Sequence, residues 1–170
     1  MSHGQDEGSG AGIGFDTARG RDYPSVRQFN VFVENRVGNL LGVVRRFEAT
    51  DIRIVALTII DSADCAIIRM VLSDPERARE IFDRHGLPCT ESDLLVVGLP
   101  DGDQPLVQIC KALLGAEISI HYAYPLMVGP HGHSALALHV EDHETAAQTL
   151  TRMGFTLYTE GDLEDDGGLS

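Results

Sequence analysis

The order of hydrophobic and polar positions divides residues 26–159 into alternating strand-like and helix-like segments. In the first half, β-branched and apolar runs predict strands near 26–33, 52–60, 65–73 and 88–97. Apolar residues at helical spacing predict helices near 39–49 and 74–85. In the second half the same criteria predict strands near 94–99, 118–126, 135–140 and 155–159, and helices near 104–114 and 142–153. The order strand, helix, strand, strand, helix, strand therefore occurs twice.

The two halves also match in sequence. The apolar positions of the first helix and the following strand recur 66 residues later; they are Leu40, Val43, Val44, Phe47, Ile52 and Ile54, matched by Leu106, Ile109, Cys110, Leu113, Ile118 and Ile120. Positions around the second helix recur at an offset of 68, which places one short insertion near residues 128–133. If the segment around 93–99 serves both halves as a strand, they are fused with almost no linker, and we expect a rigid pair.

Charge and composition narrow the function. The 170 residues contain 13 Lys and Arg against 26 Asp and Glu, a net charge of −13. Nucleic acids and anionic membrane surfaces are bound through basic patches, so we expect neither as a partner. No apolar run approaches the roughly 20 residues that span a bilayer, and no apolar segment typical of a signal peptide follows the first residue. We therefore expect a cytoplasmic protein with reduced, buried cysteines.

Both ends of the sequence differ from the middle. Residues 1–24 are rich in Gly, Ser and charged residues without a hydrophobic period, which predicts a disordered tail. Residues 160–166 contain five acids and no base, so we expect a solvated acidic tail over 162–170. Between the tails we expect two domains, 25–92 and 93–161.

The polar loop between the first strand and the first helix is the most informative segment. Residues 35–39, Asn-Arg-Val-Gly-Asn, separate the apolar run at 31–33 from the helix face that begins at Leu40. A helix N-terminus carries unpaired N–H groups and a positive partial charge, so this loop favours a small anion such as a carboxylate.

These residues carry a family resemblance. The sequence FVENRVGNLLGVVRRF, followed by ALTI at 56–59, resembles an ACT domain, and specifically that of the small regulatory subunit of acetolactate synthase. The motif positions are Asn35, Gly38 and Leu40, with Arg53 on the next strand where family members commonly have Asn. The second half resembles the family more weakly, because Asp101 replaces Asn35, Gln104 replaces Gly38 and Ser119 replaces Arg53.

The resemblance implies an α+β fold of two ferredoxin-like βαββαβ units, with antiparallel sheets and helices packed on one face. It implies a regulatory protein that is not an enzyme, needs no cofactor, and binds an amino acid where two ACT domains meet. The implied ligand-binding residues are Asn35, Arg36, Val37, Gly38, Asn39, Leu40 and Arg53 in the first half, and Asp101, Gly102, Asp103, Gln104 and Ser119 in the second. The usual small subunit has one ACT domain and a different C-terminal domain, whereas this chain has two ACT-like halves.

Each candidate has a purely structural alternative. Asn35 and Gly38 can simply form a turn, with Asn39 as the helix cap. Arg53 either pairs with a carboxylate or is a surface charge. The acidic second loop suits an ammonium group or a cation, or else Asp103 caps a helix whose first turn contains Pro105.

Histidine supports a second hypothesis. Five of the seven histidines lie within 23 residues, namely His121, His131, His133, His139 and His143. Imidazoles bind zinc, nickel or copper, so a metal-responsive regulator that uses His121, His131 and His133 is the alternative function. The spacing matches no defined metal motif, and a solvated loop with scattered histidines also explains it.

Known catalytic motifs are missing. No dinucleotide-binding glycine pattern, phosphate-binding loop or nucleophile elbow occurs in the sequence. We expect the protein to form a homo-oligomer, or to bind a biosynthetic enzyme, through apolar positions such as Ala56, Ile68 and Met70.

Overall fold

A computed structural model describes residues 22–165 of the chain, and most of the predicted N-terminal tail and residues 166–170 lie outside this range. The first unit contains β1 (Val26–Glu34), α1 (Asn39–Val44), the 3-10 turn η1 (Arg45–Phe47), β2 (Ile54–Asp61), β3 (Cys65–Leu72), α2 (Pro75–Arg84) and β4 (Cys89–Gly98). The second adds α3 (Pro105–Gly115), β5 (Ile120–Pro125), the 3-10 turn η2 (Pro130–Gly132), β6 (Ala135–Val140), α4 (His143–Arg152), β7 (Leu157–Tyr158) and α5 (Glu160–Glu164).

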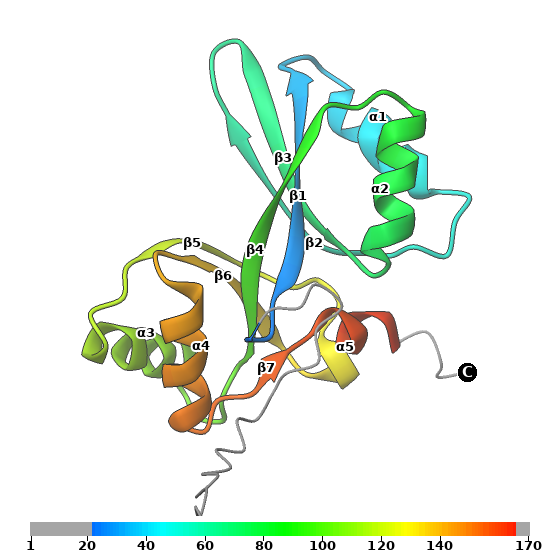
Figure 1. Ribbon diagram of the computed structural model, residues 1–170. Helices are drawn as coiled ribbons and strands as arrows, with labels where there is room; N and C mark the ends of the chain where they lie inside the picture. Colours follow the sequence, from blue (N-terminus) through cyan, green and yellow to red (C-terminus); the bar gives the residue numbers. More distant parts are fainter. Residues whose placement is uncertain (1–21, 166–170) are drawn as a thin grey trace, which may run out of the picture.

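All seven strands belong to one curled antiparallel sheet, in which β4 is shared by both units. The order is β2-β3-β1-β4-β6-β5, with β7 also paired to β4. Residues 89–94 of β4 pair with β1, and residues 95–98 pair with β6. Figure 1 shows β4 running without a break from the upper unit into the lower one. The predicted α+β fold of two ferredoxin-like units is confirmed, but their sheets form a single surface, and the predicted division at 92/93 falls inside β4.

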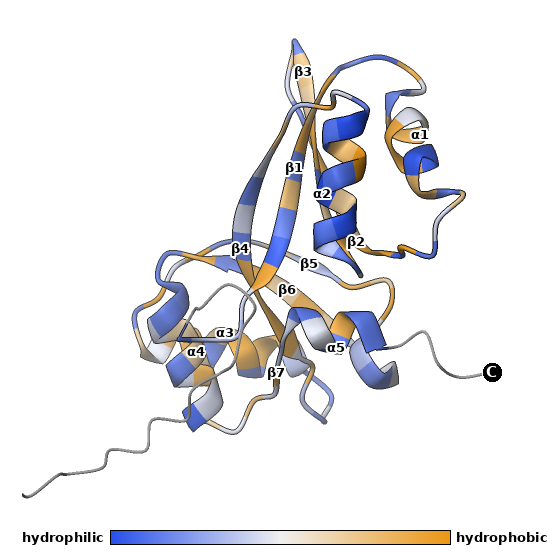
Figure 2. Cartoon of the chain, turned by 45° about the vertical axis from the view of Figure 1, so that its right-hand side comes forward, coloured by the Kyte–Doolittle hydropathy of each residue, from blue (hydrophilic) through white to orange (hydrophobic). Residues whose placement is uncertain are grey.

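The helices cover one face of each half of the sheet. α1 and α2 pack over one apolar cluster, which includes Phe29, Phe47 and Phe82, and α3 and α4 pack over another, which includes Leu113 and Leu150. In Figure 2 the apolar sides of α2 and α4 face the strands, and their polar sides face outward. This amphipathic arrangement is what the helical spacing of apolar residues predicts.

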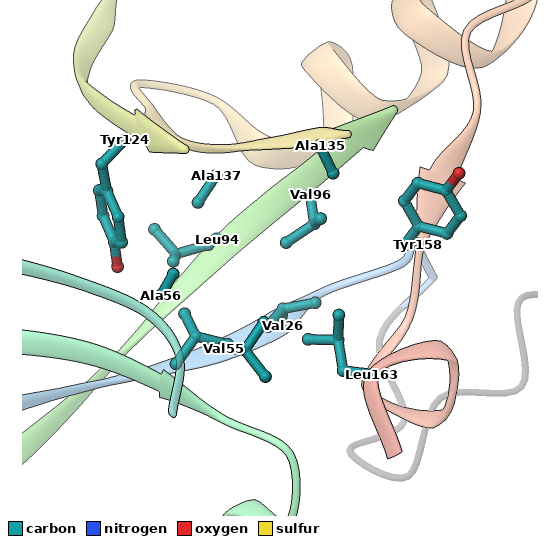
Figure 3. Packing of buried hydrophobic residues seen from close by; sticks show 11 residues of the cluster. Val26, Val55, Ala56, Leu94, Val96, Tyr124, Ala135, Ala137, Tyr158 and Leu163 are labelled. Carbon is teal, nitrogen blue, oxygen red and sulfur yellow. The ribbon is translucent and has the colours of Figure 1, made fainter. Parts of the chain in front are cut away.

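A third apolar cluster joins the two units on the opposite face of the sheet. Figure 3 shows Val26 and Val55 from the first unit in one cluster with Ala137 and Tyr158 from the second, and Leu94 and Val96 of β4 belong to the same cluster. The start of β2 also bonds to the second unit, because the Val55 carbonyl accepts from Met127 N–H at 2.7 Å. The units are therefore packed against each other as one body.

The structure corrects several expectations. Ala56, Ile68 and Met70 have at most 1% of their surface exposed, so they belong to the core of the chain and offer no surface to a second copy. Residues 160–164 form α5 rather than a solvated tail, because Leu163 is buried at the junction of the units. Cys110 is exposed rather than buried.

Candidate functional site

The loop between β1 and α1 is held by its own backbone. Gly38 has φ of 90°, a left-handed conformation that glycine adopts at little cost. Arg36 N–H donates to the Glu34 carbonyl at 2.9 Å, and Asn39 N–H donates to the Arg36 carbonyl at 3.2 Å. The Asn39 side-chain amide donates to the Glu34 carbonyl. Asn39 is thus the first residue of α1 and does not cap it, which rules out the cap alternative.

Three backbone donors of the loop have no acceptor within the described part of the chain. These are the N–H groups of Val37, Gly38 and Leu40, and no side chain caps α1. Val37 is fully exposed, so solvent reaches this end of the helix. The three donors can therefore bind an anionic oxygen atom.

Asn35 is fixed by the hairpin between β2 and β3. Its Nδ2 donates to Oδ1 of Asp61 at 2.6 Å and to the Ser62 carbonyl at 3.5 Å. Its Oδ1 makes no hydrogen bond among residues 22–165 and remains an acceptor. Acidic and amide oxygens thus lie beside the three N–H donors, an arrangement with complementary groups for an ammonium and a carboxylate.

Two shallow hollows flank this loop. One of about 120 Å³ is lined by Val33, Glu34, Asn35, Arg36, Asn39, Leu40, Ile59, Ala66 and Ile68. The other, of about 310 Å³, is lined by Phe32, Val33, Glu34, Asn39, Gly42, Val43, Arg46 and Leu87. The sequence alone did not identify Asp61, Gly42 or Arg46 as neighbours of this loop. The i, i+4 spacing of Gly42 and Arg46 could have indicated that both line one side of the helix.

Arg53 lies away from this loop. It precedes β2, whereas Asn35 contacts Asp61 at the far end of that strand. The Arg53 guanidinium donates through Nη2 to the Leu163 carbonyl at 2.8 Å and so holds α5. Arg53 is therefore more than a bare surface charge, and it lines neither of the hollows beside the Asn35 loop.

The second loop is built differently. Gln104, not Asp103, is the N-cap residue of α3, and its side chain makes no capping bond. Asp101 lines a hollow of about 280 Å³ with His133 and Tyr158, and its carbonyl accepts from the Gln108 side chain at 3.0 Å. Gly102, Asp103 and Gln104 do not line this hollow.

Ser119 is separated from the second loop in the same way that Arg53 is from the first. It precedes β5, while the loop follows β4 beside the start of β6, since Leu99 N–H donates to the Ser134 carbonyl at 2.9 Å. β5 and β6 are antiparallel, so the start of β6 lies beside the end of β5 and far from Ser119.

The structure does not bring His121, His131 and His133 together. His131 pairs with Asp162 at 3.0 Å in the loop beyond the end of β5, and His133 lines the hollow beside Asp101. His121 lies at the start of β5 against His139. Within residues 22–165, no group of three or more His, Cys, Asp or Glu side chains has the geometry of a metal site.

Comparisons with known proteins agree with this architecture. The model of the family described as an ACT domain pair matches residues 24–165. A solved structure of a protein from Bacteroides thetaiotaomicron aligns with a TM-score of 0.75 and 21% identity, covering 84% of this chain and 98% of that one. The ligand-free regulatory subunit of aspartate kinase from Thermus thermophilus aligns with a TM-score of 0.52 and 10% identity, covering 76% and 92%. No curated protein matches the chain. At these identities the likeness to the solved structures concerns the fold.

These matches bear on the class of the protein. ACT domains are amino-acid-binding regulatory modules, so the family points to a regulatory rather than a catalytic role. Neither the family description nor the two solved structures named above refers to acetolactate synthase. No helix in the described part of the chain is long and apolar enough to cross a membrane. With its family model matched over nearly all of the described residues, the chain belongs to the family of ACT domain pairs.

Proposed function

We propose that this protein senses a free amino acid through the loop of its first unit and passes the signal to a biosynthetic enzyme. The observation that carries the proposal is the set of unpaired N–H groups at Val37, Gly38 and Leu40 next to the Asn35 Oδ1. The N–H groups bind the α-carboxylate. Asn35 Oδ1 and the carboxylate of Asp61 bind the α-ammonium.

The second loop contributes less to this proposal. Its Asp101 carboxylate repels a ligand carboxylate, and the chain has Gln104 where the first loop has a glycine. We place the competent amino-acid site in the first unit alone. Because the hollows beside the first loop are shallow, a second surface must cover the ligand, either from another copy of this chain or from the partner enzyme.

The proposed regulation takes place in the cytoplasm. Acetolactate synthase is the first partner to test, on the resemblance of the first-unit loop to its regulatory subunit. Regulation requires that the affinity of this chain for the amino acid differ between the free chain and its complex with the enzyme. Only such a difference in affinity shifts an equilibrium. The catalytic subunit should therefore respond to the amino acid more strongly in the presence of this chain, and an unchanged response excludes this partner.

Thermal unfolding in the presence of each of the twenty amino acids tests the site. At a concentration of about 100 times Kd, a ligand adds roughly 2.7 kcal/mol. For a chain of this length the unfolding midpoint then rises by roughly 5–10 °C. If no amino acid moves the midpoint, the proposed function is wrong.

Gly38→Asp should abolish that shift. The new carboxylate repels the ligand carboxylate, and the backbone at φ of 90° disfavours a side chain. Gly86→Asp is the matched control, since Gly86 also has a positive φ of 62° with open space around its Cα, but it follows α2. Both variants should lose some stability, and only Gly38→Asp should lose the ligand-induced shift. Equal shifts in the two variants would exclude this loop as the site.

A further inference from the structure

A pair of histidines lies on the second unit, away from the amino-acid loop. His121 is at the start of β5 and His139 is near the end of β6. Pairing between these strands shifts register between Ile120 and Tyr122, so His121 occupies a β-bulge opposite His139. A bulge turns a side chain that would otherwise point to the other face of the sheet. It brings the Nδ1 atoms of the two rings to 3.2 Å from each other.

This separation fits two ligands of one metal ion. Imidazole nitrogens bind Zn²⁺ at about 2.0–2.1 Å, so two nitrogens on a tetrahedral ion lie about 3.3–3.4 Å apart. With ligands at right angles, as in octahedral sites, they lie about 2.9 Å apart. The observed 3.2 Å lies between these values. Without an ion, the two Nδ1 atoms form a hydrogen bond in which one ring donates and the other accepts, and a bound ion would replace that bond.

The surroundings hold the His139 ring in place. The His139 ring stacks on the Tyr122 ring, with 4.7 Å between the two centroids. The guanidinium carbon of Arg69 lies over the same Tyr122 ring, 3.7 Å from its centroid. Burial lowers the pKa of His139, and the charges of His143, His121 and Arg69 lower it further, while Asp93 opposes them.

We propose that His121 and His139 form a two-histidine chelate for a borderline divalent transition ion, with water in the remaining coordination positions. Zn²⁺, Ni²⁺ and Cu²⁺ favour imidazole nitrogen, whereas Mg²⁺ and Ca²⁺ favour oxygen. Two protein ligands make a weaker site than the three or four of catalytic and structural zinc. The fraction of chains with a bound ion therefore varies with the metal concentration, and no ion is held permanently.

Calorimetric titration of the full chain with Zn²⁺ tests the proposal. We expect one ion per chain at this site, and replacement of one ligand should weaken binding by at least about tenfold. His121→Ala is the principal variant, because His121 is exposed and its loss leaves the fold intact. His85→Ala is the matched control, since His85 is also exposed and lies at the end of α2. Mg²⁺ should not bind.

The binding atoms and the pH dependence distinguish this site from adsorption of metal elsewhere. In NMR spectra of the imidazole nitrogens, Zn²⁺ should shift Nδ1 of His121 and His139 and leave Nδ1 of His131 unchanged. Affinity should fall as the pH decreases, because protons compete with the ion for the imidazole nitrogens. Absence of Zn²⁺ binding, or equal binding by His121→Ala and His85→Ala, overturns the proposal. The amino-acid shift of the first unit is measured without metal, so either proposal can fail alone.

Discussion

Arg27 is the residue that ties the start of β1 to two helices of different units. Its Nη2 lies 2.8 Å from Glu76 of α2 and 3.2 Å from Glu160 of α5, and its Nε lies 3.2 Å from Glu160. The Arg27 side chain is 6% exposed and that of Glu160 16%. Burial lowers the pKa of Arg27, but its bonds to the two carboxylates outweigh this and raise it, so the guanidinium stays charged.

Arg27→Met should therefore destabilise the chain. It leaves the half-buried carboxylate of Glu160 without its cation, and breaking a buried pair costs about 3 kcal/mol. Urea unfolding measures this loss. Arg77→Met is the control, because the Arg77–Asp51 pair is exposed and surface ion pairs contribute little to stability. Equal losses would show that Arg27 contributes no more than a surface charge.

The lowered pKa of His139 makes stability depend on pH. Between the folded pKa and about 6.5, the unfolded chain binds more protons than the folded one. Stability is therefore complete above about pH 6.5 and falls as the pH decreases toward the folded pKa. In metal-free urea unfolding at pH 7.5 and 5.5, His139→Gln should reduce the difference between the two pH values, and His85→Gln should not. An unchanged difference in His139→Gln would contradict this assignment.

At the scale of elements, the sequence predicted what depends on local periodicity. Glycine after α2 and α4 marks their ends, and Gly86 and Gly154 both have positive φ, as expected of helix C-termini. It did not predict α5, because a single apolar residue, Leu163, stands among five acids and has no periodic partner. The pairing of Arg53 with the Leu163 carbonyl depends on residues 110 positions apart, which no local pattern contains.

In the candidate site, the sequence located the loop but not its internal contacts. Asn35 and Gly38 were found because a short polar segment separates an apolar strand from a helix face. The partner of Asn35, Asp61, is brought in by pairing of strands and has no local signal. The cap alternative for Asn39 is excluded only by the backbone conformation, because Asn is favoured both at helix caps and in turns.

Helix α5 should stabilise the junction of the units. Leu163 is 2% exposed and packs with Val26, Val55 and Tyr158. Leu163→Ala should lower the free energy of unfolding by about 2–4 kcal/mol in urea titration. Leu114→Ala removes a leucine that is 75% exposed and should change it by less than about 0.5 kcal/mol. A loss below 1 kcal/mol for Leu163→Ala would mean that α5 detaches readily.

At the scale of the whole molecule, the two units should unfold as one. The chain has no Trp, and its four tyrosines lie at residues 23, 122, 124 and 158, outside the first helix-covered core. Phe82→Ala alters that first core and should cost about 3–5 kcal/mol. Tyrosine fluorescence and circular dichroism should both report the full loss, in one coincident transition. If fluorescence keeps the wild-type midpoint, the units unfold separately.

Leu150→Ala provides the reciprocal measurement. Leu150 is the counterpart of Phe82 in the second unit, and both are fully buried. Its loss should lower the free energy of unfolding by about 2–5 kcal/mol and shift the same single midpoint downward, without a second transition. Two resolved steps in either variant would contradict cooperative unfolding.

The shared strand also limits how this chain can change over generations. In β4, Leu94 and Val96 face the cluster between the units, while Leu95 and Val97 face the core under α3 and α4. Deleting or inserting one residue there would exchange these faces in both units at once. Replacing one half of the chain with the corresponding half of a related protein would interrupt β4, which both halves use. We therefore expect the pair to be inherited as one unit, with variation concentrated in its loops.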